Sequence, residues 1–142
     1  MAIKELPKEQ NSTDLISLLE SHQLKEKAIS ATPKADFSYG FFDGEQYLGG
    51  ITANVFMNTM HVQLLAVAEE VRGKAIGQQL LHTVEAEATK LKCTYITIHT
   101  QDYQALTFYQ KFGYQVFGQL PDMPFTGTTK YYLYKRLDKA DA

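Results

Sequence analysis

The chain has 142 residues, a formal net charge of −2, and a composition that is 44% hydrophobic and 21% charged. This is the size of one domain, so we expect a single domain over residues 1–142 with its own core. The slight negative charge excludes a basic surface for nucleic acid. No stretch approaches the ~18 apolar residues of a membrane span, and the amino terminus does not resemble a signal peptide. We therefore expect a cytoplasmic protein without nucleic-acid or membrane partners.

The first helical signals lie in the amino-terminal quarter. Ser12, Thr13 and Asp14 precede an apolar run. Short oxygen side chains can accept hydrogen bonds from the first free N–H groups of a helix, so a capped helix is expected to begin here. A second short helix is predicted over Leu24–Ile29, ending before Pro33.

Three strands are predicted next. Phe37–Phe42 and Gln46–Phe56 flank Asp43-Gly44, a strong signal for a hairpin turn. His61–Val67 has alternating character. Strict alternation would put Val62, Leu64 and Ala66 on one face and His61, Gln63, Leu65 and Val67 on the other.

The remaining elements alternate between helix and strand. An apolar stripe at helical spacing predicts a helix over Ile76–Leu91. We expect a strand over Thr94–His99, a helix over Ala105–Phe112 ended by Gly113, and two last strands over Tyr114–Phe117 and Lys130–Leu137. This order predicts a mixed α/β fold: a largely antiparallel central sheet with helices on both faces.

Arg72–Gly77 joins the third strand to a helix and has the character of an anion-binding loop. The first N–H groups of a helix lack partners within it, and small residues let an anion approach them. Arg72 and Lys74 add positive charge. The sequence of this loop matches neither the Walker phosphate-binding motif nor the glycine-rich dinucleotide-binding motif. A phosphate or pyrophosphate is the implied ligand, and an ordinary strand-to-helix turn is the alternative.

A second motif follows one strand later, where Ala105–Tyr114 reads Ala-Leu-Thr-Phe-Tyr-Gln-Lys-Phe-Gly-Tyr. Together the two segments resemble the Gcn5-related N-acetyltransferase (GNAT) superfamily. Its patterns are Arg/Gln-x-x-Gly-x-Gly/Ala and Ala-x-x-Phe-Tyr-x-Lys-x-Gly-Phe/Tyr, and the order of elements is similar over nearly the whole chain. The resemblance implies a GNAT-like fold with a βα phosphate-binding loop, and acetyl-CoA as co-substrate without a metal. It also implies transfer of the acetyl group to a primary amine of a small molecule or protein by direct attack.

The resemblance also assigns coenzyme contacts to particular positions. Leu65 and Val67 would pair with pantetheine through their backbone, with an N–H near Val67 directed at the thioester carbonyl. Ala75 stands where a glycine is usual, and Asp102 where many relatives have an asparagine that touches pantetheine. The expected coenzyme-binding residues are Leu65, Val67, Arg72, Gly73, Lys74, Ala75, Ile76, Gly77, Asp102 and Tyr109.

Two side chains are the candidates for catalysis. Tyr109 would donate a proton to the leaving thiolate, since a phenol with a pKa near 10 is protonated at neutral pH; the alternative is a core aromatic residue. His61 would accept the proton of the amine, because its ordinary pKa near 6.5 suits a general base; the alternative is an exposed histidine at a strand end. The competing bases are Glu45, Glu69, His99 and Asp102.

The acceptor amine is not identified by the sequence. Its site is expected to involve the first two helices, Gly49-Gly50, Asn54 and the loop Gln119–Thr129, with Tyr131, Tyr132 and Tyr134 as walls or as sheet packing. A catalytically weak or inactive acyl-CoA-binding module, acting as sensor or scaffold, is the main alternative function, and transfer of a larger acyl group is another. A metal enzyme is disfavoured because the four histidines lack ligand spacing. Many relatives are homodimers, so a homodimer is also implied.

Overall fold

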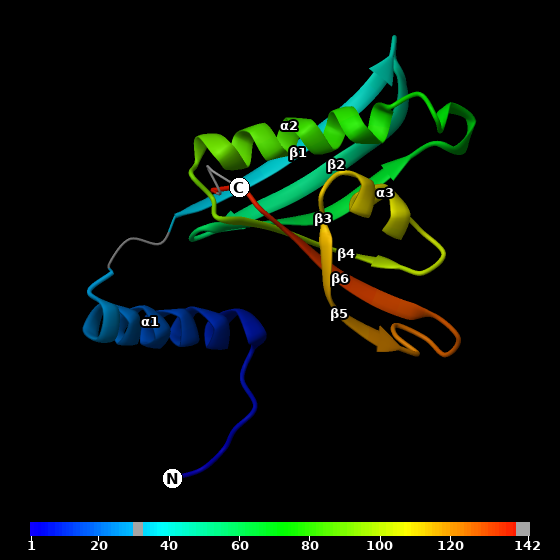
Figure 1. Cartoon of the computed structure of the whole chain (residues 1–142). Coiled ribbons are helices and arrows are strands. Elements are labelled where there is room, and N and C mark those ends of the chain that lie inside the picture. The colour runs from blue at the N-terminus through cyan, green and yellow to red at the C-terminus, as the bar shows by residue number, and fades with distance from the viewer. Residues whose placement is uncertain (30–32, 139–142) are drawn as a thin grey trace. The chain divides into compact units, whose positions relative to one another are not determined.

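The computed structural model describes residues 1–29 and 33–138. The chain divides into two compact units, Met1–Thr32 and Pro33–Ala142, and we describe each by itself. The single domain expected from the sequence therefore stays a prediction. None of the helices among the described residues is both long and apolar enough to cross a membrane. Figure 1 traces the elements within each unit.

The first unit contains one helix, α1 (Lys8–Lys27). Pro7 precedes it, and no side chain caps its first turn. The predicted start at Ser12–Asp14 is wrong: these residues lie inside the helix, where the Thr13 hydroxyl donates to the carbonyl of Glu9 at 3.1 Å. Pro7 stands at the N-cap position with a non-helical ψ of 136°, and the helix begins directly after it at Lys8.

The same helix also absorbs the second helix predicted over Leu24–Ile29. No glycine or proline interrupts the chain between Lys8 and Lys27, so one helix continues through both predicted segments. It ends where Ala28 adopts a left-handed conformation with φ of 56° and donates its N–H to the carbonyl of Leu24 at 2.9 Å. The prediction of two separate helices is therefore wrong.

The second unit is built on a six-stranded sheet with the strand order β1-β2-β3-β4-β6-β5. Only the β3–β4 pair is parallel, and every other pair is antiparallel. The strands are β1 (Lys34–Asp43), β2 (Gln46–Phe56), β3 (Thr59–Val67), β4 (Tyr95–Gln101), β5 (Gln115–Pro121) and β6 (Thr129–Arg136). The helices are η1 (Glu69–Val71), α2 (Ile76–Lys90) and α3 (Leu106–Lys111). The predicted mixed, largely antiparallel sheet flanked by helices is confirmed.

A bulge in β3 changes which of its side chains face the core. The register with β2 shifts because Thr52 pairs with Leu64 while Ala53 pairs with Val62, so Gln63 is an extra residue. Val62 is buried, whereas Leu64 is 72% exposed and Leu65 packs against the core. The strict alternation predicted for this strand is therefore wrong beyond Gln63, since one inserted residue reverses the faces that follow.

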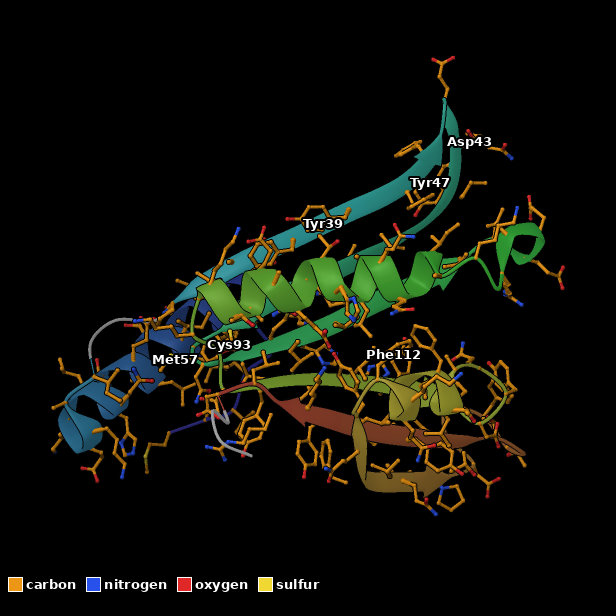
Figure 2. All side chains as sticks on the ribbon, turned by 45° about the horizontal axis from the view of Figure 1, so that its top comes forward. Tyr39, Asp43, Tyr47, Met57, Cys93 and Phe112 are labelled. Atoms are coloured by element: carbon orange, nitrogen blue, oxygen red, sulfur yellow. The ribbon has the colours of Figure 1, made fainter. Side chains whose placement is uncertain are left out.

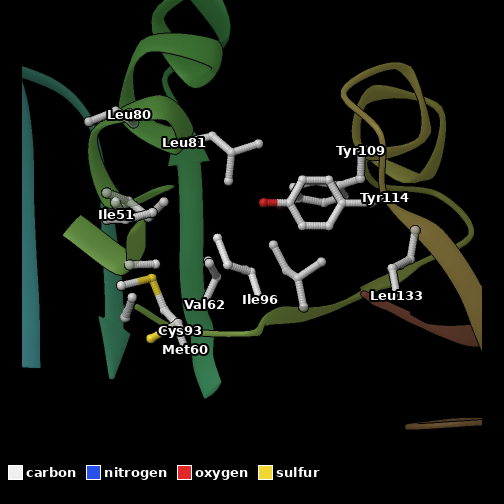
Figure 3. Close-up of a cluster of buried hydrophobic side chains, with 14 of the residues drawn as sticks. Ile51, Met60, Val62, Leu80, Leu81, Cys93, Ile96, Tyr109, Tyr114 and Leu133 are labelled. Atoms are coloured by element: carbon white, nitrogen blue, oxygen red, sulfur yellow. The ribbon is translucent and has the colours of Figure 1, made fainter. Parts of the chain in front are cut away.

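One buried cluster joins the sheet to both α2 and α3 (Figure 3). The predicted apolar stripe of α2 supplies a large part of it, and Cys93 is buried there as a small apolar residue. The buried members are Ile51, Ala53, Val55, Met60, Val62, Ile76, Leu80, Leu81, Val84, Ala88, Cys93, Ile96, Ile98, Tyr109, Tyr114 and Leu133. The core therefore fixes α2, which carries the candidate anion loop at its start.

Two tyrosine–glutamate hydrogen bonds hold α2 on the sheet. Tyr39 of β1 donates to Glu87 at 2.7 Å, and Figure 2 shows Tyr39 beside α2. Tyr114 donates to Glu85, also at 2.7 Å, and Lys135 contacts the same Glu85 oxygen at 3.2 Å. These bonds satisfy the half-buried carboxylates and link α2 to β1, to β6 and to the residue just before β5.

Replacing Tyr114 by phenylalanine is expected to lower the free energy of unfolding by about 1–2 kcal/mol, because the buried Glu85 carboxylate loses a hydrogen-bond donor. Urea denaturation measures the change. Tyr134→Phe is the matched control, since its hydroxyl bonds to Gln115 in an exposed position, and it should cost less than about 0.5 kcal/mol. Equal losses in the two variants would contradict the inference that the hydrogen bond between Tyr114 and Glu85 stabilises the packing of α2 on the sheet.

Candidate functional site

Strands β3 and β4 separate along their length and leave an open strand edge inside the sheet. They pair only from Thr59 to His61 on β3 and from Tyr95 to Thr97 on β4. Figure 1 shows their carboxyl ends pointing apart. The rest of β3, up to Val67, has no strand partner on that side among the described residues. Such an edge offers backbone N–H and C=O groups to an extended ligand that carries amides.

Leu65 and Val67, the two residues predicted to contact pantetheine through their backbone, lie on this open edge. Ala68 donates its N–H to Leu48 of β2 at 2.8 Å. Because N–H groups alternate in direction along a strand, those of Val67 and Leu65 point away from β2 and toward the gap. Gly49 lies opposite Val67, and a Cβ there would stand 2.8 Å from the carbonyl oxygen of Ala66. A glycine at position 49 therefore allows β2 and β3 to approach closely at this point.

The loop after β3 leads into a helix end that is free to bind an anion. No side chain caps α2, and its first turn contains no acidic residue. Arg72, Gly73 and Lys74 are exposed. At this end of α2, the first backbone N–H with a hydrogen-bond partner is that of Gln79, which donates to the carbonyl oxygen of Ala75 at 3.1 Å. The N–H groups before it form the positive end of a 15-residue helix, as an anion site requires.

Gly77 is the point at which β3, α2 and α3 meet. A Cβ added to it would lie 3.4 Å from the ring of Phe108 and 3.6 Å from a methyl group of Val67. The two sequence motifs are therefore neighbours in space, although some thirty residues separate them in the chain. Buried Ile76 anchors the helix start in the core, while the loop before it remains exposed.

Ala75 adopts a left-handed conformation, with φ of 62°. An L-residue with a Cβ pays roughly 1–2 kcal/mol in this region, so the glycine that is usual here would fit better.

We expect Ala75→Gly to tighten coenzyme A binding a few-fold, since its backbone relaxes and the methyl group no longer holds the anion away. The free energy of unfolding should change by less than about 1 kcal/mol, because relief of strain is offset by the greater entropy of glycine in the unfolded chain. Isothermal titration calorimetry measures the first quantity and urea denaturation the second. Ala75→Val should weaken coenzyme A binding and lower the free energy of unfolding. Weaker binding by the glycine variant would contradict the pyrophosphate assignment.

Tyr109 is a buried residue of α3, only 4% exposed. Its ring lies 5.3 Å from that of Phe108. It lies 5.9 Å from the ring of Tyr114, which Figure 3 shows beside it. Burial raises the pKa of its phenol to about 12, so the hydroxyl keeps its proton at neutral pH. Both sequence interpretations of Tyr109, a core aromatic and a proton-bearing donor, are compatible with this position.

His61 lies at the last position where β3 pairs with β4, just before these two strands separate. Its Nδ1 is 2.9 Å from the hydroxyl oxygen of Thr97, and its ring is 5.3 Å from that of His99 on β4. Burial lowers the pKa of His61, a hydrogen bond with the Thr97 backbone opposes this, and the positive charge of Lys130 lowers the pKa further. Burial is also the largest cause that lowers the pKa of His99, followed by the charges of Lys130 and His61. The structure thus pairs the predicted base with one of its competitors.

Asp102 has structural partners that the sequence did not reveal. Its carboxylate accepts hydrogen bonds from the Thr128 hydroxyl at 2.9 Å and from the Thr129 N–H at 3.1 Å. These bonds tie the turn after β4 to the loop that precedes β6. Each carboxylate oxygen accepts one of these bonds and has a further lone pair left, so a coenzyme contact through Asp102 stays a prediction.

A surface hollow of about 330 Å³ lies away from this site. Its lining residues are Tyr95, Gly113, Gln115, Tyr134, Lys135 and Arg136. Tyr95 begins β4 and pairs with Thr59, so the hollow lies at the end opposite the strand separation. Within the described part of the chain, no group of three histidine, cysteine or acidic side chains is placed to hold a metal ion.

Comparisons with known proteins agree with this geometry. Residues 4–122 match the model of the acetyltransferase (GNAT) domain family. The blasticidin-S acetyltransferase of Streptomyces morookaense is 34% identical over 101 residues, which span 70% of this chain and 74% of that protein.

Solved structures show the same fold. A crystal structure of an acetyltransferase from Bacillus cereus has a TM-score of 0.83 at 26% identity, and covers 96% of this chain and 98% of the other. An acetyltransferase from Bacillus anthracis in complex with acetyl coenzyme A has a TM-score of 0.64 at 19% identity, and covers 72% and 62%. At that identity the second likeness is one of fold. The open edge of β3, the uncapped start of α2 and these matches lead to one conclusion: the chain belongs to the GNAT acetyltransferase family.

Proposed function

We propose that the protein transfers an acetyl group from acetyl-CoA to a primary amine of a small molecule. The observation that carries this proposal is the open edge of β3 leading directly into the uncapped start of α2. A small-molecule acceptor is favoured over a protein amine because the relative from Streptomyces morookaense is named for an antibiotic, blasticidin-S.

The coenzyme would lie along these two elements. Its pyrophosphate would accept hydrogen bonds from the first N–H groups of α2, with Arg72 and Lys74 adding positive charge. Its pantetheine amides would pair with the free edge of β3 at Leu65 and Val67. An N–H of that edge would then donate to the thioester oxygen as negative charge develops on it.

The reaction requires a neutral amine. Its nitrogen attacks the thioester carbon, a C–N bond forms, and the C–S bond breaks as coenzyme A leaves as a thiolate. The amine's surplus proton passes to a base, for which we propose His61. The lowered pKa of His61 keeps the ring able to accept a proton at neutral pH. When the Thr97 oxygen accepts from Nδ1–H, Nε2 is the free basic nitrogen.

The position of His61 favours proton transfer through water. It precedes Leu65 by four residues, which would span about 13 Å in a regular strand and span less here because of the bulge at Gln63. A histidine side chain spans only part of that length, so one or two water molecules would complete the path from the amine. Of the N–H groups of Leu65 and Val67, that of Leu65 lies nearer to His61 along the strand. We propose that it donates to the thioester oxygen alongside the N–H of Val67.

Tyr109 would assist the departure of the thiolate through a hydrogen bond. Full proton transfer is unfavourable, because its pKa of about 12 lies well above the ~8.5 typical of a thiol. A hydrogen bond from a neutral phenol still stabilises developing charge on sulfur, and a buried donor needs little reorganisation.

A thiol-release assay with acetyl-CoA tests the function. The panel should contain small primary amines, aminoglycosides, amine-bearing nucleosides and peptides. Release that depends on a small amine, together with mass-spectrometric detection of the N-acetyl product, is the expected result. Coenzyme binding without release from any amine would favour the alternative of a non-catalytic acyl-CoA-binding module. Faster turnover with a longer acyl-CoA would instead point to a larger donor.

A further inference from the structure

We propose that Lys130, which ends a row of side chains running through Tyr132 and His99 to His61, is an electrostatic positioning residue of the acceptor site and selects weakly basic amines as acceptors. This inference rests on the proposed function, because it concerns the same amine and the same base. It adds a residue outside both sequence motifs and a class of acceptor.

Four side chains form a continuous row across β6, β4 and β3. The Lys130 ammonium lies 5.5 Å from the centre of the Tyr132 ring. That ring lies 5.9 Å from the ring of His99, which is 5.3 Å from the ring of His61. His99 pairs with Tyr132 between strands, and each of the four side chains is half-buried. The row therefore spans the point at which β3 and β4 separate.

The charged and titratable groups around His61 are mainly basic or neutral. From β4 it faces Thr97 and His99, and its register partner on β2 is the neutral Asn54. The acid nearest in register is Asp36 of β1, which pairs with Asn54 on the far side of β2. No acidic side chain contributes to the lowered pKa of His61 or His99, whereas Lys130 contributes to both.

Lys130 is held where its charge acts on the two imidazoles. The face of the Tyr132 ring attracts the ammonium and limits its freedom. Lys130 forms no ion pair with any residue in the ranges 1–29 and 33–138. A half-buried and unpaired positive charge is screened less than one in open solvent, so its field reaches neighbouring groups.

This field favours one kind of acceptor. A protonated amine that enters beside Lys130 meets a like charge and loses affinity, whereas a neutral amine does not. Strongly basic amines are almost entirely protonated at neutral pH, and weakly basic amines are largely neutral. The site should therefore discriminate against lysine-like amines and polyamines and accept amines of low basicity.

Titration of the histidine ring protons by NMR tests the electrostatic part without any acceptor. His61→Gln and His99→Gln assign the signals, and His22 and His82 are internal references. In Lys130→Met both His61 and His99 should titrate at higher pH than in the wild type. Lys130→Arg, which keeps the charge, should restore the wild-type curves. Lys90→Met is the control for loss of a lysine elsewhere, since Lys90 is an exposed residue of α2. Unchanged curves in Lys130→Met would overturn the inference and leave the proposed function intact.

The acceptor preference is tested with ethylamine and its mono-, di- and trifluorinated analogues, whose basicity falls with little change in size. Thiol release is measured with wild type and Lys130→Met at fixed pH. Loss of the lysine should shift the rate ratio toward the more basic amines by roughly three- to tenfold, the effect expected of a single nearby charge. An unchanged ratio would overturn the proposed selectivity. Absence of turnover with every amine tested, including the wider panel, would count against the proposed function and not against the titration result.

Discussion

Replacing His61 by glutamine is expected to lower kcat/KM about 100-fold, the contribution typical of a general base. The wild-type rate should fall as pH decreases through the pKa of His61, since only the neutral ring accepts a proton. Burial lowers that pKa from 6.5, so the midpoint of the acidic limb should lie below 6.5. In His61→Gln the part of this limb that comes from the ring should disappear, which leaves only the fall caused by protonation of the amine acceptor itself. A pH profile of kcat/KM for the best amine of the panel measures both effects.

His82→Gln is the matched control for this substitution, because His82 is an exposed residue of α2. It should keep both the rate and the acidic limb. A His61→Gln enzyme with an acidic limb that the pKa of the amine does not account for would show that another group accepts the proton. His99 would then be the next candidate, since its ring lies 5.3 Å away and its pKa is lowered for the same reasons.

Tyr109→Phe is expected to reduce kcat about 10- to 100-fold while the Kd for coenzyme A stays nearly constant. The substitution removes one hydroxyl and keeps the ring that packs against Phe108 and Tyr114. Only the interaction with the leaving sulfur is lost, and that interaction strengthens in the transition state. Because the Tyr109 pKa is about 12, no basic limb from this residue should appear below pH 10. Steady-state kinetics and calorimetric titration measure the two constants.

Tyr114→Phe provides a control with the opposite signature. Tyr114 is also a buried tyrosine of the same cluster, but its hydroxyl bonds to Glu85. It should lower stability and leave kcat close to that of the wild type. If Tyr109→Phe instead lowers stability and leaves kcat unchanged, Tyr109 is a core aromatic residue without a part in the reaction.

Local patterns predicted the loop and the helix that carry the candidate coenzyme site. The apolar stripe placed the start of the long helix at Ile76, which is where α2 begins. At position 75, where the family resemblance leads to the expectation of a glycine, Ala75 has a left-handed backbone. Such features depend on near neighbours in the chain, through helix periodicity and backbone sterics, so a sequence can reveal them.

Other features were missed because they depend on contacts between distant segments. The bulge at Gln63 arises from the register between β2 and β3, and it reversed the predicted faces of Leu64 and Leu65. The bonds of Asp102 to Thr128 and Thr129 join segments about 26 residues apart. A residue-by-residue pattern carries no signal for either contact.

The sequence predicted that a strand, a loop and a helix follow one another from Leu65 to Gly77, because each is specified by residues within a few positions. The tertiary fold separates β3 and β4 after His61 and Thr97 and leaves the edge of β3 free. It also brings Lys130, Tyr132 and His99 into one row with His61. The physical reason is that strand order and register are chosen by burial of the whole core, to which every strand contributes at once.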